Sequence, residues 1–321
     1  MTEVITPLTQ ALAEGKLTRA ELRGFMQRSD ALAFRHLGLW LLVLAATSAL
    51  VWLALGTWWL VPAMFAQGVV MVHFFSLQHE CVHYTVFRTR RFNDWAGVAC
   101  GWIIGLPHQF FRYEHCDHHT HTQITGDDPE QVPLPRTIWG YLWYISAIPY
   151  WRTKIGEIAR HAMGRLTAAE RRFVPKVAET TLIREARVMV VVYALILAAM
   201  LAFQWAGPLW FWLIPLMMGE PVMRFVRMTE HVGRPTVADM RDNTRTNLIP
   251  KPLQFLCWNM NYHAEHHYAA SVPFHALPRL HAKLRGYVHV EPGGYIGAHR
   301  EILAQILGKR PRADQTPVDP G

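Results

Sequence analysis

The sequence predicts an all-α membrane protein with four transmembrane helices in two hairpins and a helical cap on the cytosolic side. Two long uncharged apolar runs, the uneven placement of basic residues and the tryptophans beside the predicted turns support this class. The 321 residues are 51% hydrophobic and 17% charged, which excludes an intrinsically disordered chain. Four cysteines without a CxxC pair exclude a disulfide-rich scaffold and a cysteine-based zinc or redox motif.

The first apolar run extends from His36 to Gln78 without a single Lys, Arg, Asp or Glu. As one helix it would measure roughly 65 Å, which is more than one crossing of a ~30 Å hydrocarbon core requires. We therefore predict a hairpin of two spans, with the turn at Gly56-Thr57. Three tryptophans flank this turn, where aromatic side chains commonly meet the membrane surface: Trp52, Trp58 and Trp59.

The second uncharged run extends from Val188 to Gly219 and is interrupted by Gly207-Pro208. It predicts a second helical hairpin, whose second arm continues towards His231. The competing interpretation, two buried core helices of a soluble protein, is disfavoured because core helices seldom run this long without a polar face.

The basic residues indicate which side of the membrane each segment occupies. All 32 Lys and Arg fall within 1–35, 88–187 and 224–321, and four crossings place these three segments on one side. The positive-inside rule makes that side the cytoplasm, so we predict a multi-pass protein of the cytoplasmic (inner) membrane. The net charge of +8 then reflects topology and contact with anionic lipids, and no nucleic-acid partner is expected because no nucleic-acid-binding motif accompanies it.

The whole chain is predicted to form one membrane domain. Its expected segments are an N-terminal cytosolic helix (1–35), hairpin 1 (36–78), a first cap segment (79–187), hairpin 2 (188–226), a second cap segment (227–308) and a disordered tail (309–321). Two shorter apolar stretches, Trp95–Phe111 and Thr137–Trp151, are expected to turn back or to lie in the interface without crossing.

Three clusters contain many of the 18 histidines. They are His79-Glu-Cys-Val-His83, His115-Cys-Asp-His118-His119 and His263-Ala-Glu-His266-His267. On a helix, residues i, i+3 and i+4 share one face, so each cluster aims two or three imidazoles at one point. Neutral imidazole is the commonest side-chain metal ligand, and eight of them exceed the coordination shell of one ion. The clusters therefore predict two metal ions, for which iron, copper and zinc are all chemically suitable.

Neighbouring polar residues are assigned supporting roles. Glu80, Asp117 and Glu265 point away from the ligand faces and are expected to hold imidazole N–H groups, as is Glu230 beside the last span. His231 is predicted as a ninth ligand, with a helix cap as its alternative role, and Asn261 is a candidate for holding a metal-bound water. His121 lies off the ligand face and is a weaker candidate than its neighbours.

From about residue 36 to 290 the sequence resembles the integral-membrane fatty acid desaturase/hydroxylase superfamily with its three histidine boxes. The resemblance rests on the two hairpins and on the boxes HECVH, HCDHH and WNMNYHAEHH. It implies a non-haem di-iron centre with two Fe²⁺ ions and a mushroom-shaped fold with an acyl channel. The implied ligands are His79, His83, His115, His118, His119, His263, His266 and His267, and a further histidine of the family corresponds to His231. Because no cytochrome b5-like region is fused to the chain, the resemblance also implies a separate electron donor of the ferredoxin or cytochrome b5 type.

The expected activity is O2-dependent desaturation of a fatty acyl or similar alkyl chain, with no catalytic residue beyond the metal ligands. A hydroxylase or a terminal-alkene-forming oxidase on the same site is the nearest alternative, because the radical left by the first hydrogen abstraction has more than one fate. A metal transporter is the alternative from another class. It is disfavoured because transporters bind their substrates near the bilayer midplane on broken spans, whereas these clusters lie at the cytoplasmic ends of the predicted spans.

Overall fold

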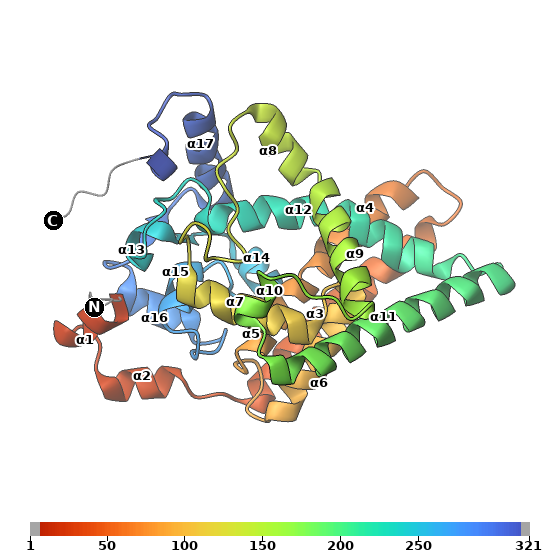
Figure 1. Ribbon diagram of the computed structural model, residues 1–321, viewed down its shortest axis with the longest axis horizontal. Coiled ribbons are helices and arrows are strands. Elements are labelled where there is room, and N and C mark those ends of the chain that lie inside the picture. The colour runs from red at the N-terminus through yellow and green to blue at the C-terminus, as the bar shows by residue number, and fades with distance from the viewer. Residues whose placement is uncertain (1–6, 316–321) are drawn as a thin grey trace.

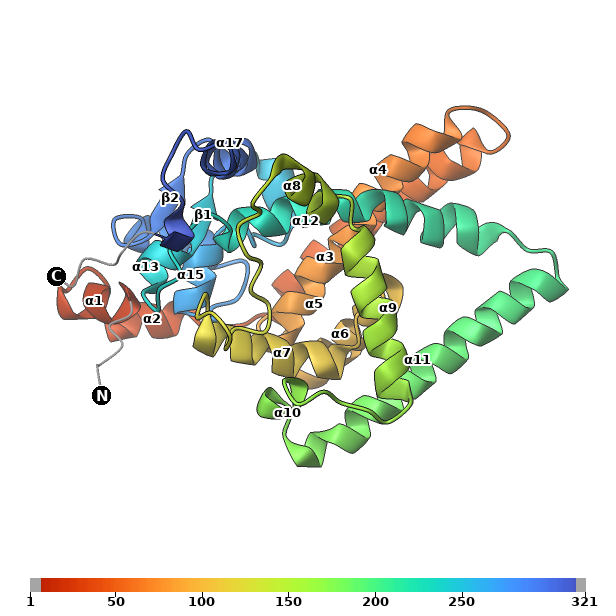
Figure 2. The ribbon, with the colours of Figure 1, turned by 45° about the horizontal axis from the view of Figure 1, so that its top comes forward.

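The computed structural model describes residues 7–315, which are mostly helical (Figure 1). Four helical segments are long and apolar enough to cross a membrane, which confirms the predicted class. They are α3 (Asp30–Ala54), α4 with α5 (Leu60–Val72 and Phe74–Val82), α11 (Lys176–Ala202), and η1 with α12 (Leu209–Leu213 and Ile214–His231). Figure 2 shows the tips of both hairpins at one end of the molecule and most of the remaining helices at the other.

The outward faces of these spans carry apolar side chains that are largely exposed. Leu42, Leu53 and Leu201 are 65%, 76% and 72% exposed, respectively. In water such a surface would drive association, whereas in a bilayer it is the surface that lipid requires. The chain is therefore a membrane protein with four spans.

Both predicted turns are present, but the helices extend beyond the uncharged runs. Gly56, with a φ of +77°, lies between α3 and α4, and residues 203–208 connect α11 to η1. α11 begins at Lys176, well before Val188, and α5 continues to Val82, so His79 lies on the last turn of a span. The charged first turns of α3 and α11 are the reason that an uncharged run underestimates the length of a span.

Each hairpin contains one irregular turn, and in the second hairpin a proline explains it. α4 and α5 are separated at His73, whose Nδ1 lies 3.3 Å from Ser76 Oγ. The π-helical turn η1 precedes Pro215, which has no N–H to donate to the carbonyl of Phe211. Gln67 Nε2, at 3.4 Å, donates to that carbonyl instead and so satisfies it inside the membrane.

The two hairpins cross at a pair of glycines, Gly68 on α4 and Gly219 on α12. A Cβ atom on Gly68 would overlap the carbonyl oxygen of Pro215, and one on Gly219 would overlap the backbone of Gly68. Small residues permit this close approach of two membrane helices.

The substitution Gly68→Ala should therefore destabilise the protein by about 1–3 kcal/mol, because backbone and not a flexible side chain occupies the required space. Thermal unfolding in detergent measures the loss. Gly38→Ala on α3 is the matched control, since nothing lies within 4 Å of the position that its added methyl group would take. Equal stability of the two variants would contradict the proposed crossing.

The apolar stretch Trp95–Phe111, which follows the first hairpin, turns back as predicted and does not continue as one helix. α6 (Arg90–Ile104) ends at Gly105, whose φ is +70°, and α7 (His108–His121) begins three residues later. Gln78 Nε2 donates to Leu106 O at 2.8 Å, and the Glu185 carboxylate accepts the backbone N–H groups of His108 and Gln109. These contacts cap the start of α7, the helix that carries the second histidine cluster.

The remaining elements are shorter. They are α1 (Pro7–Ala13), α2 (Arg19–Phe25), α8 (Ile138–Ile145), α9 (Ile148–Ala162), α10 (Glu170–Phe173), α13 (Met240–Asn243), α14 (Lys251–Leu256), α15 (His263–Tyr268), α16 (Leu277–Leu284), α17 (Gly294–Ile306), the 3-10 turn η2 (Ala313–Gln315), β1 (Arg245–Asn247) and β2 (His289–Glu291). We call α1, α2, α8 and α13–α17 the cap, because they lie at the end opposite the hairpin tips (Figure 2).

A small parallel pair of strands positions the third histidine cluster. β1 pairs with β2 in the register Arg245↔His289. Asn247 at the end of β1 donates through Nδ2 to Thr229 Oγ1 on α12 (3.1 Å), and its backbone N–H donates to Asn261 O (2.9 Å). β1 therefore holds the loop before α15 against the last turn of α12.

The final residues differ from the prediction of a disordered tail. Arg312 donates to the carbonyl oxygens of Leu134 and Pro135 and pairs with Asp314, so residues 309–315 are ordered against the chain. The rest of the predicted tail, 316–321, lies outside the described residues.

Candidate metal centre

Nine histidines from four elements gather into two groups. The first histidine group consists of His79, His83, His115, His119 and His266, and the second of His118, His231, His263 and His267. Within each group, one ring nitrogen from every member lies within 4.8 Å of all the others. The sequence clusters are thus shared between the groups, since the second and third clusters each contribute to both.

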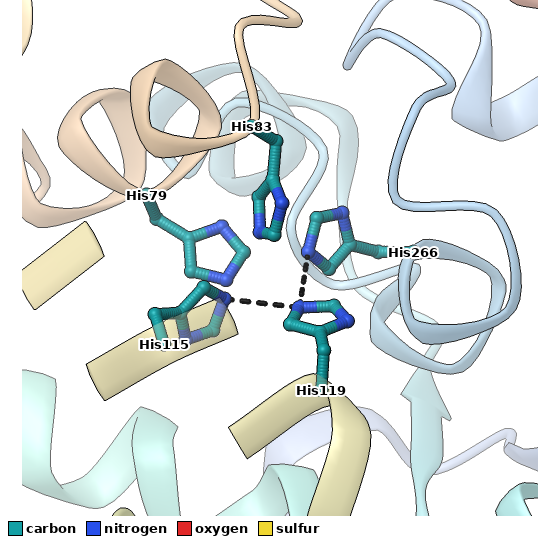
Figure 3. A group of neighbouring side chains, drawn as sticks. All are labelled: His79, His83, His115, His119 and His266. Atoms are coloured by element: carbon teal, nitrogen blue, oxygen red, sulfur yellow. Dashed lines mark hydrogen bonds between the residues drawn. The ribbon is translucent and has the colours of Figure 1, made fainter. Parts of the chain in front are cut away.

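Figure 3 shows the rings of the first histidine group pointing towards a common centre. They come from the end of α5, from α7 and from α15. His119 Nε2 lies 3.0 Å from His115 Nε2 and 3.1 Å from His266 Nε2. The second histidine group is equally tight, with His263 Nε2 3.0 Å from the Nε2 atoms of both His231 and His267.

The two groups adjoin. The His119 and His267 rings, one from each group, stack with centroids 4.1 Å apart and planes at 14°. The His79 and His263 rings lie 6.1 Å apart. Two ions bound in these groups would be neighbours able to act on one substrate.

Acceptors on the outer side of the rings fix the tautomer of several imidazoles. His115 Nδ1–H donates to Glu130 Oε1 and His118 Nδ1–H to Asp128 Oδ1, both at 2.7 Å. In the second group, His267 Nδ1 lies 3.2 Å from Thr122 Oγ1. A neutral imidazole that donates from Nδ1 has its free lone pair on Nε2. These contacts therefore orient the rings so that the acceptor atom Nε2 faces the centre of each group.

Several of these inward nitrogens are buried without a hydrogen-bond partner among the described residues. They include Nε2 of His83 and of His118 and one nitrogen of His79, whose two ring nitrogens both lack a partner and of which one is an acceptor in the neutral ring. Unpaired buried acceptors of this kind are costly unless a cation receives their lone pairs. The residues present therefore fit two metal ions.

Burial keeps most of the rings outside the spans in the neutral form that binds metal. Burial, and then repulsion between neighbouring imidazoliums, lowers the pKa of five rings well below its usual value: His115, His119, His263, His266 and His267. The pKa of His118 is raised instead, because Glu130 and Asp128 outweigh the effect of burial. A cation at His118 Nε2 would take the place of that proton.

The residues predicted to support the ligands meet different partners. Glu80 Oε1 lies 3.6 Å from His266 Nδ1, and Glu230 Oε2 lies 3.8 Å from His263 Nε2. Asn261 lines a small cavity beside His79 and Glu230. Glu80, Glu230 and Asn261 thus lie next to the groups, with Glu230 beside the inward Nε2 of His263; their supporting role stays a prediction.

Two other residues do not reach the groups. Asp117 pairs with His121 on the outer face of α7, and Glu265 accepts from His281 Nδ1 at 2.6 Å. Each points away from the ligands of its own helix, so neither holds one of the nine rings. His121, the weaker candidate, belongs to neither group, and its side chain is 37% exposed.

Sequence reasoning missed the carboxylates that contact the second cluster. Asp128 and Glu130 belong to the DDPE segment shortly after α7, and Arg227 on α12 holds Glu130 at 2.6 Å and Glu230 at 2.8 Å. The only available signal was the acidic segment that follows the cluster, which the sequence alone does not place against particular rings.

The fold and site define a class, a four-span α-helical membrane protein with two adjoining histidine groups that could hold metal. The family model described as "Fatty acid desaturase" matches residues 56–296, and the chain belongs to this family. It is therefore an oxidoreductase of the desaturase type.

Similar proteins agree with this assignment. The chain is 22% identical over 279 residues to the sn-1 oleoyl-lipid 12-desaturase of Picosynechococcus sp., which covers 77% of this chain and 76% of the relative. It is 22% identical over 276 residues to the enzyme of the same name from Anabaena variabilis, covering 74% of each. It is 23% identical over 268 residues to the chloroplastic omega-6 fatty acid desaturase of Arabidopsis thaliana, covering 76% of this chain and 57% of the relative.

Proposed function

We propose that this protein introduces a double bond into the acyl chain of a membrane lipid, using two Fe²⁺ ions, O2 and a separate electron donor. The observation that carries the proposal is the convergence of nine imidazoles in two adjoining groups at the end of a four-span bundle. Zinc suits imidazole ligands but is not redox-active, whereas a desaturase must remove electrons. The named substrates of the cyanobacterial relatives, sn-1 oleoyl lipids, support a lipid-linked chain.

The electron balance explains the need for a donor. Converting a CH2–CH2 unit to CH=CH removes two hydrogens, while reducing O2 to two waters takes four electrons and four protons. The substrate supplies two of each, so the other two electrons come from a small ferredoxin-type or cytochrome b5-type protein and the other two protons from the solvent. The metal pair, when bound, supplies the O2 chemistry.

The chain's own residues position ligands and keep water away. Glu130, Asp128 and Thr122 hold Nδ1 of His115, His118 and His267, so that Nε2 of each faces the metals. The small cavity beside His79 has apolar walls that include Phe75, Met223 and Val226, and these exclude bulk water from the site of C–H cleavage. The alkyl chain needs no hydrogen-bond partner there.

The proposed orientation follows from the basic residues. No Lys or Arg lies between Arg35 and Arg88 or between Arg187 and Arg224, so the basic residues lie at the histidine-group ends of the spans or in the segments that four crossings place on that side. We propose that this side is cytoplasmic and that the protein occupies the cytoplasmic membrane. An electron donor in the cytoplasm would then have access to the metal centre.

Product analysis tests the function. The chain is expressed in a host fed deuterated saturated fatty acids, and mass spectrometry of the lipids is combined with metal analysis of the purified protein. We expect loss of two deuterium atoms per product chain and about two iron ions per protein. Gain of oxygen would indicate a hydroxylase and loss of carbon dioxide a terminal-alkene-forming oxidase. Zinc with unchanged lipids would exclude all three.

A further inference from the structure

An apolar groove opens on the membrane-spanning part of the molecule, between α6, α9, α11 and α12. Its volume is ≈ 550 Å³, and its walls include Ile103, Trp151, Ala159, Ile196 and Leu216. This volume lies within the range of about 300–1,000 Å³ that is typical of small-molecule sites. Because two of the four walls belong to membrane spans, the molecule available to fill the groove is a lipid chain.

The polar backbone atoms at the edge of this lateral groove are satisfied within the protein. The carbonyl groups in the last turn of α6 have no partner in their own helix. Tyr193 Oη donates to Trp102 O at 2.6 Å, and Trp212 Nε1 donates to Ile103 O at 2.7 Å. The lateral groove therefore offers an apolar surface without unsatisfied backbone carbonyl groups at its edge, which suits an alkyl chain.

Lys154 marks the inner end of the lateral groove and also lines a second cavity of ≈ 360 Å³. In this ion-paired cavity every cation has its own carboxylate: Lys154 Nζ–Glu157 at 3.2 Å, Arg224–Glu220 at 2.7 Å and Arg227–Glu130 at 2.6 Å. No positive charge is left for an anionic carboxylate or for the phosphates of a coenzyme. The cavity suits an uncharged ester, whose carbonyl can accept a hydrogen bond without separating an ion pair.

Phe75 separates the ion-paired cavity from the metal centre. It lines that cavity and also the small cavity of ≈ 10 Å³ beside His79 and Glu230. The small cavity holds about one water molecule, so no chain reaches the histidines while Phe75 stays in place. Its ring lies 5.4 Å from the Phe111 ring and 5.9 Å from the His79 ring, between the two spaces.

We propose that the acyl chain of an ester-linked membrane lipid leaves the bilayer through the lateral groove, passes Lys154 into the ion-paired cavity and reaches the metals when the Phe75 ring moves aside. This route rests on the proposed function, because it assigns the substrate class of the same site. It makes Ala159 a determinant of access and Phe75 a determinant of which carbons react.

The first test fills the groove. Ala159→Trp places an indole in the lateral groove, whereas Ala198→Trp, the matched control, adds one to an exposed position of α11 outside it. We expect Ala159→Trp to raise KM for the lipid by about tenfold or more, equivalent to ~1.4 kcal/mol of binding. Ala198→Trp should leave KM unchanged.

A binding measurement accompanies the kinetics. Phosphatidylcholine with a photoactivatable diazirine in its acyl chain should crosslink to α9, α11 and α12 of the parent protein and of Ala198→Trp, but not to Ala159→Trp. Unchanged crosslinking and KM in Ala159→Trp would overturn the route. A parent protein that crosslinks there but makes no unsaturated product would instead refute the proposed function and leave the lipid site standing.

The second test removes the barrier. Phe75→Ala should shift the position of the new double bond or broaden the accepted chain lengths, as gas chromatography of the product esters reports. The neighbouring Phe74 packs against Trp40 on the other side of α5, at 4.8 Å, so Phe74→Ala is the matched control for lost packing. An unaltered product pattern in Phe75→Ala, in protein that remains folded, would contradict its role.

Discussion

His118→Ala is expected to lower product formation by at least about 100-fold, more than the 10–100-fold typical of a lost outer partner of a metal ligand. His118 is one of only four imidazoles in the second histidine group, so its loss leaves three. The bound metal should fall from about two ions to about one per chain, because the five-membered first group is intact. Metal analysis and product mass spectrometry measure the two effects.

His121→Ala is the matched control, because His121 lies on the same helix and in the same stretch of sequence. It pairs with Asp117 at the surface and belongs to neither group. We expect full metal content and activity within about twofold of the parent, as for most surface substitutions. If both variants retained two metal ions, or lost activity equally, the assignment of His118 as a ligand would be wrong.

The second large effect is expected for Arg227→Ala, which removes the cation between two buried carboxylates. Arg227 pairs with Glu130 at 2.6 Å and with Glu230 at 2.8 Å, and Glu130 in turn accepts the Nδ1–H of His115. Breaking a buried ion pair by removing one partner costs about 3–5 kcal/mol, because the remaining charge is left unpaired. The free energy of unfolding should fall by this amount, and metal affinity should fall with it.

Two controls separate this effect from a general loss of charge. Arg171→Ala removes an exposed pair with Glu179 and should cost about 0–1 kcal/mol. The triple variant Arg227→Met, Glu130→Gln, Glu230→Gln leaves no unpaired charge and should regain part of the stability lost in Arg227→Ala. Denaturation in detergent measures all three, and equal stability of Arg227→Ala and Arg171→Ala would show that the buried pairs contribute nothing.

The spans and the turns were predictable from the sequence because both depend on local composition. A bilayer selects helices by length and lack of charge, and the breaks at Gly56 and Gly207-Pro208 are local as well. The helix limits were predicted less accurately. α11 starts at Lys176, and its first turns contain charged residues that an uncharged run does not include. The order of residues 309–315 was also missed, because it depends on contacts of Arg312 with the distant Leu134 and Pro135.

Eight of the nine histidines were likewise identified from spacing, because i, i+3 and i+4 share a helical face whatever the rest of the chain does, whereas His231 was identified from its place at the end of the last span. Their division into groups of five and four was not, since His118 and His119 are adjacent in sequence yet lie in different groups. Adjacent helical residues point about 100° apart, and only the packing of α5, α12 and α15 around α7 decides which partners each ring meets.

Packing between distant segments also decides which residues hydrogen-bond to the ligand rings. A carboxylate between two ligands of one helix, such as Asp117 or Glu265, faces away from them and pairs elsewhere. The rings are instead held by carboxylates from other segments, as His115 is by Glu130 and His118 by Asp128. The sequence by itself determined the four spans, because a bilayer selects helices by length and lack of charge. It also determined the three histidine clusters, because i, i+3 and i+4 share one helical face. Only the tertiary structure decided the grouping of the ligands, their hydrogen-bond partners and the cavities, because each depends on contacts between segments far apart in the chain.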